Sequence, residues 1–88
     1  MRRKERKEEV RRLPLSPFRV EIDRVGRGLS VLVGGATAIL EFSEERASVG
    51  AGGYRVEISG RSLSIAVYEC GSVEIVGRVE DVSFVIEN

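Results

Sequence analysis

The stretch that decides the fold runs from Tyr54 to Ile86 and reads YRVEISGRSLSIAVYECGSVEIVGRVEDVSFVI. Apolar and polar residues alternate along it in four short runs. Alternation with period two, in β-branched residues separated by glycines, indicates antiparallel strands with one buried face. We expect Gly60 and Gly77 to be turn glycines that each end a strand. The apolar residues predicted to face the core are Tyr54, Val56 and Ile58, then Leu63, Ile65 and Val67, then Val73 and Ile75, and finally Val82, Phe84 and Ile86.

Upstream of Tyr54 the same alternation predicts four further strands, over residues 18–23, 29–33, 36–42 and 46–51. In the first of them Phe18, Val20 and Ile22 are expected to face the core. Gly34-Gly35 and Gly52-Gly53 accept positive φ and suit two-residue hairpin turns. The whole chain then has eight candidate strands and no helix, with turn signals about every 8–12 residues. This pattern predicts an all-β fold, a small antiparallel sandwich or barrel-like meander.

The basic residues are concentrated at the N-terminus. Residues 1–12 hold seven Arg or Lys and three Glu, a balance of +4, and residues 13–88 hold seven Arg against eleven acids, a balance of −4. Two prolines, Pro14 and Pro17, end any helix before the strands begin. We therefore divide the chain into a basic arm, flexible or helical, over residues 1–13 and a β domain over residues 14–88. The arm is either solvated or a contact for an anionic membrane or acidic partner, and Arg2, Arg3, Arg6 and Lys7 would carry that contact.

Several kinds of catalytic site are excluded by composition. The chain has no histidine and a single cysteine, Cys70, so a His-based triad, a His or paired-Cys metal site and an internal disulfide are all ruled out. Glu44-Glu45 and Glu80-Asp81 are adjacent carboxylates, but neighbouring strand residues point to opposite faces. We expect no enzyme activity, no cofactor and no small-molecule substrate. The lone thiol and the absence of a long apolar run or signal-peptide pattern favour a cytoplasmic location.

Some apolar residues fall opposite the predicted core-facing sets, namely Leu32, Ile39, Val76 and Val85. Two interpretations stay open at this point. Scattered exposed apolar residues are ordinary, and a sandwich corner buries both faces of a strand. Alternatively, the four residues form a surface for self-association or for a partner protein.

The order of these segments resembles a known family. A Leu-Ser-Val-Leu strand is followed by Ala-Ile-Leu-Glu-Phe-Ser-Glu-Glu-Arg, and then by the two glycine-ended strands VEISGR (56–61) and VEIVGR (73–78), with Leu63-Ser64-Ile65 between them and Phe84 after. From about Leu13 onward the chain resembles the YabP/YqfC family of sporulation proteins, and it is closer to the short YqfC type. The resemblance implies a small β protein made in the mother cell of an endospore-forming bacterium. It also implies a role in spore cortex or coat formation, genes beside integral-membrane sporulation proteins, and no enzymatic activity.

These observations predict a non-enzymatic binding or assembly module, cytoplasmic in the mother cell and peripheral at a membrane through a membrane-associated sporulation protein. One alternative is a self-assembling, homo-oligomeric subunit of a spore-associated layer. Another is a small nucleic-acid-binding β-barrel. Against the last, the folded part is net acidic and has few aromatic residues for base stacking, so we expect no nucleic-acid partner.

Overall fold

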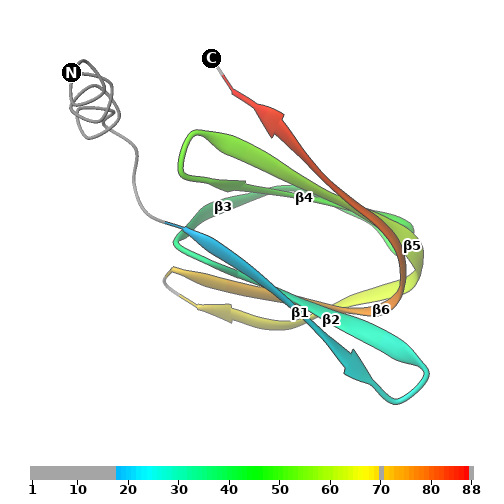
Figure 1. The fold of residues 1–88 in the computed structure, drawn as a ribbon. Helices are drawn as coiled ribbons and strands as arrows, with labels where there is room; N and C mark the ends of the chain where they lie inside the picture. Colours follow the sequence, from blue (N-terminus) through cyan, green and yellow to red (C-terminus); the bar gives the residue numbers. More distant parts are fainter. Residues whose placement is uncertain (1–17, 70, 88) are drawn as a thin grey trace, which may run out of the picture.

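The computed structural model describes residues 18–69 and 71–87, which form one antiparallel sheet of six strands (Figure 1). The arm predicted over residues 1–13 and the thiol of Cys70 lie outside the described residues. In space the strands follow the order β1-β2-β6-β5-β4-β3, so β1 and β3 are the two outermost strands. The strands are β1 (Arg19–Val25), β2 (Gly28–Gly34), β3 (Ala36–Phe42), β4 (Arg46–Ala51), β5 (Tyr54–Glu69) and β6 (Ser72–Ile86).

The number of strands is six rather than eight because β5 and β6 run through the glycines predicted to end them. A Cβ on Gly60 would overlap the carbonyl oxygen of Arg78, and a Cβ on Gly77 would lie 2.6 Å from the carbonyl oxygen of Ser62. Gly77 also has a φ of 149°, which side-chain-bearing residues rarely adopt. The pairing of β5 with β6 shifts register between Ser59 and Gly60 and again just beyond. These glycines therefore let two paired strands bend together, as bulges do, and the strand ends predicted there are wrong.

The bend folds the sheet so that its two halves face each other (Figure 1). One half, here the β2 half, contains β1, β2, residues 63–69 of β5 and residues 72–77 of β6. The other, the β4 half, contains β3, β4, residues 54–60 of β5 and residues 79–86 of β6. The predicted all-β antiparallel fold is confirmed, whereas the sandwich or barrel is not: the strands form one open sheet, bonded continuously across the bend. The buried core between the halves consists of Val31, Val33, Ala47, Val49, Ala51, Val56, Ile58, Leu63, Val73 and Ile75.

The two predicted glycine hairpins have different outcomes. Gly52-Gly53 does connect paired strands, since Ala51 lies opposite Tyr54, and both glycines have positive φ, 55° and 85°. The hairpin predicted at Gly34-Gly35 is wrong, because β2 and β3 are not neighbours in the sheet. Gly35 has a φ of 84° and its N–H donates to the carbonyl oxygen of Gly71 at 2.7 Å. The positive φ of Gly35 lets the chain turn here, so that it passes from the β2 half to the β4 half.

Candidate functional site

Strand β6 loses a neighbour as it passes the bend. Its first segment, Ser72–Gly77, lies between β2 and β5, and Val73 and Ile75 are 1% and 0% exposed. Its second segment, Val79–Ile86, pairs with β5 alone among the described residues, and Phe84 and Ile86 are 50% and 67% exposed. We call this second segment the β6 edge. It presents unpaired backbone groups beside exposed apolar side chains, a combination that favours pairing with another chain.

The other free edges carry features that oppose such pairing. Edge strand β1 is charged, and Arg19 Nε lies 2.7 Å from Glu21 Oε2. Edge strand β3 shifts register twice against β4, and the second segment of β5 has a shift between Ile65 and Val67. Charges and bulges are the usual means by which proteins protect sheet edges. The β6 edge, in contrast, keeps an unbroken register from Asp81 to Ile86.

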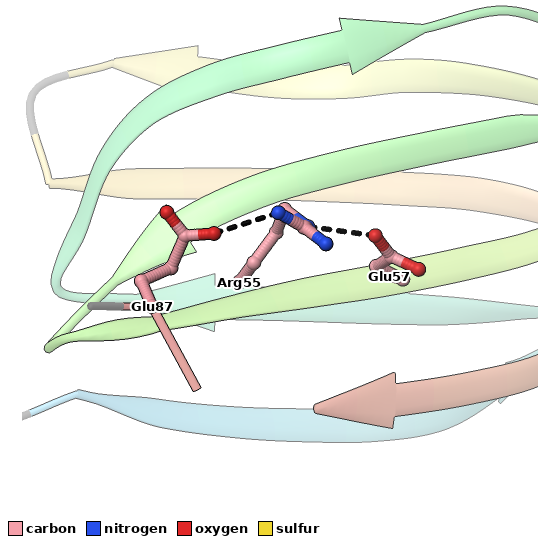
Figure 2. Close-up of polar contacts among 3 residues, drawn as sticks. All are labelled: Arg55, Glu57 and Glu87. Atoms are coloured by element: carbon pink, nitrogen blue, oxygen red, sulfur yellow. Dashed lines mark hydrogen bonds and ion pairs between the residues drawn. The ribbon is translucent and has the colours of Figure 1, made fainter. Parts of the chain in front are cut away.

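An ion-pair network fixes the far end of the β6 edge (Figure 2). The guanidinium of Arg55 donates to Glu57 Oε2 through Nε and to Glu87 Oε2 through Nη1, each at 2.7 Å. The hydrogen bond with Glu57 is the main cause that raises the pKa of Arg55, so the side chain stays cationic at any physiological pH. The N–H of Glu87 also donates to the carbonyl oxygen of Gly53 at 2.9 Å. The edge is therefore held extended up to its last residues.

The apolar residues predicted as an interaction surface do not form one patch. Val31 and Val33 are fully buried, so Leu32 between them points to the outside of the β2 half, as does Val76. Val85 lies opposite Arg55 on the outside of the β4 half. Ile39 lies opposite Val49 and packs against the core. All four are half-buried, and the other members of the predicted surface, Arg2, Arg3, Arg6 and Lys7, lie outside the described residues.

The apolar residues that are exposed in the structure differ from the predicted interaction surface. The alternating sequence pattern had placed some of them in the core. Phe84 and Ile86 do share the face of core-facing Val56, but no strand within residues 18–69 and 71–87 covers them from the side. Ile22 on β1 and Ile65 on β5 are exposed for the same reason, because each lies where a strand has one neighbour. Only the number of neighbouring strands distinguishes these residues from the buried ones, and the local sequence carries no sign of it. The large exposed apolar residues are Ile22, Val25, Leu40, Phe42, Ile65, Tyr68, Phe84 and Ile86.

Of the two carboxylate pairs, Glu44-Glu45 lies in the connection between β3 and β4, and Glu80-Asp81 lies within strand β6. The carbonyl oxygens of Glu44 and Glu45 accept the N–H groups of Leu63 and Gly60, at 2.9 and 3.0 Å. Within residues 18–69 and 71–87, no group of three or more His, Cys, Asp or Glu side chains is placed to hold a metal ion. No helix in this part of the chain is long and apolar enough to cross a membrane. Comparisons with family models, curated proteins and solved structures found no match to this chain.

Proposed function

We propose that this chain is a non-enzymatic binding module that docks by adding a partner's strand to the β6 edge. In line with its resemblance to the YabP/YqfC family, the partner is a membrane-associated sporulation protein, and the module acts in the mother cell during formation of the spore cortex or coat. The observation that carries the proposal is the β6 edge itself, a regular strand with one free side and with Phe84 and Ile86 in solvent.

Strand addition uses both features of this edge. Main-chain hydrogen bonds to the free side of β6 would give affinity, and alternate side chains of the added strand would give specificity. The added strand would cover Phe84 and Ile86, which are half or more exposed. Complete burial of such a side chain is worth about 1.5–3 kcal/mol, so each residue has roughly half or more of that still to gain.

The basic arm would add a second attraction in this proposal. Arg2, Arg3, Arg6 and Lys7 would face an anionic leaflet around the membrane partner. Each basic residue near such a surface contributes about 1 kcal/mol, and salt weakens that contribution.

A second copy of the chain is the other occupant that the edge favours. Two β6 edges paired antiparallel about a two-fold axis would place apolar side chains opposite one another, because Val82, Phe84 and Ile86 share one face. The result would be a homo-oligomer, the unit from which a structural layer could assemble. This arrangement needs no basic arm, so the two functions make different predictions for salt dependence.

The test compares Phe84→Lys with Ile22→Lys. Both wild-type side chains are 50% exposed on strands with one described neighbour, so both variants should fold and lose similar, modest amounts of stability. In sporulating cells, a fluorescent fusion of the wild type and of Ile22→Lys should be recruited to membranes, whereas Phe84→Lys should stay diffuse. Equal recruitment of all three proteins would contradict docking at the β6 edge. A purified wild type that sediments as a dimer, with Phe84→Lys a monomer, would assign the edge to a second copy.

A further inference from the structure

Three arginine side chains line one cavity beside the bend. The cavity has a volume of about 530 Å³ and lies between the β1–β2 turn and the start of the β6 edge. Arg24, Arg27 and Arg78 contribute to its wall, and all three are exposed to solvent. The other lining residues are Gly26, Gly28, Leu29, Val79 and Glu80.

Backbone contacts bring these arginines together from distant parts of the sequence. Leu29 of β2 lies opposite Gly77 of β6, and a Cβ on Gly28 would overlap the carbonyl oxygen of Gly77. The β1–β2 turn is thus held against the bend by a contact that only glycine permits. Gly26, which also lines the cavity, has a φ of 57° and no atom within 4 Å of where its Cβ would be.

Among the described residues, few carboxylates balance the positive charge at this place. Arg61 lies directly opposite Arg78 across the β5–β6 pair, and like charges in that position destabilise a sheet. Glu80 is the single carboxylate in the lining, and its Oε2 lies 3.8 Å from Arg61 Nε. No described residue forms an ion pair with Arg24, Arg27 or Arg78, whereas Arg19 and Arg55 elsewhere each meet a carboxylate at 2.7 Å. An anion supplied from outside the chain would relieve this repulsion.

The structure assigns this cavity as a binding site for a phosphate group, supplied either by free phosphate or by a phospholipid headgroup. A guanidinium offers a planar fork of donors that matches phosphate oxygens, and three arginines line this one cavity. Leu29 and Val79 give part of the wall an apolar character, which suits a group that carries an ester substituent. The cavity shares Val79 and Glu80 with the start of the β6 edge but involves neither Phe84 nor Ile86, and its test uses the isolated protein without a docked partner.

The experiment uses the full chain, the double variant Arg24→Gln/Arg27→Gln and the control Arg19→Gln/Arg46→Gln, which removes the same charge away from the cavity. Inorganic phosphate is titrated while the backbone amide resonances of Gly26 and Gly28 are followed by NMR. Co-sedimentation is measured with vesicles of phosphatidylcholine, with and without phosphatidic acid. We expect phosphate to shift both glycine resonances in the wild type and in the control. The cavity variant should bind about tenfold more weakly, since it loses charge-assisted hydrogen bonds.

The vesicle measurement separates the two sources. A selective loss of binding to phosphatidic acid vesicles in the cavity variant assigns a lipid headgroup. If the cavity variant and the control variant bind the vesicles equally, and only the cavity variant loses its response to inorganic phosphate, the ligand is free phosphate. Unshifted glycine resonances, or equal losses in both double variants, would overturn the site. Binding of a single-stranded oligonucleotide is measured for the same proteins. If the cavity variant loses more affinity for the oligonucleotide than for either phosphate source, the site is one for nucleic acid and the proposal is overturned.

Discussion

Among the described residues, the first segment of β6 has a strand on each side, and the second segment has a strand on one side only. The two segments share the same pattern of side chains, with apolar residues at alternate positions and glycine at the bend between them. Yet Ile75 is 0% exposed and Ile86 is 67% exposed. The difference arises from β2, which covers Ser72–Gly77 and ends its pairing there. Along one strand, therefore, the side-chain pattern sets which face is apolar, and the neighbouring strands set whether that face is covered.

The largest effect is expected where the two segments meet. Gly77→Val would place a side chain against the carbonyl oxygen of Ser62 at a φ of 149°. Overpacking and backbone strain together should lower the free energy of unfolding by about 2–5 kcal/mol. Urea denaturation measures this loss. Gly26→Asn is the control, because Gly26 also has a positive φ but lies in open space, and it should melt close to the wild type. If Gly77→Val unfolds like the wild type, the bend does not depend on the glycine.

The next prediction compares isoleucines in the two segments, with expected effects equal to or smaller than that of Gly77→Val. Ile75→Ala removes a fully buried side chain and should cost about 2–5 kcal/mol of unfolding free energy. Ile86→Ala removes a side chain that is 67% exposed and should cost less than about 1 kcal/mol. Both values come from the same denaturation measurement. Equal costs would mean that Ile86 is covered in solution, and the β6 edge would then not be free.

Much of the fold could be predicted from local patterns. Alternation predicted an antiparallel all-β chain, and the turn at Gly52-Gly53 followed from two residues that accept positive φ. The strand count could not be predicted this way, because a glycine in an alternating run is compatible with either a strand end or a bend. At Gly60 and Gly77 the choice depends on the backbone of the opposite strand, which presses against each glycine.

The candidate sites depend even more on distant parts of the chain. Phe84 has the alternation of a core residue, and its exposure follows from the absence of a second neighbouring strand among the described residues. Arg24 and Arg78 are far apart in the sequence and line one cavity because the β1–β2 turn rests on the bend. Neither arrangement has a signature in a short window of residues. Sequence patterns predicted the apolar faces, whereas the pairing of strands determines which positions remain available to a partner.

The exchange of backbone amide hydrogens along β6 tests the free edge most directly. In an antiparallel strand with one neighbour, about every second N–H has no partner, whereas a strand between two neighbours has nearly all of them bonded. In the dilute full chain, NMR-detected exchange should therefore be slow at the amides of Ser72–Gly77. It should alternate between slow and fast along Val79–Ile86. Slow exchange at every amide of both segments would contradict the account, because the β6 edge would already be occupied in the isolated protein.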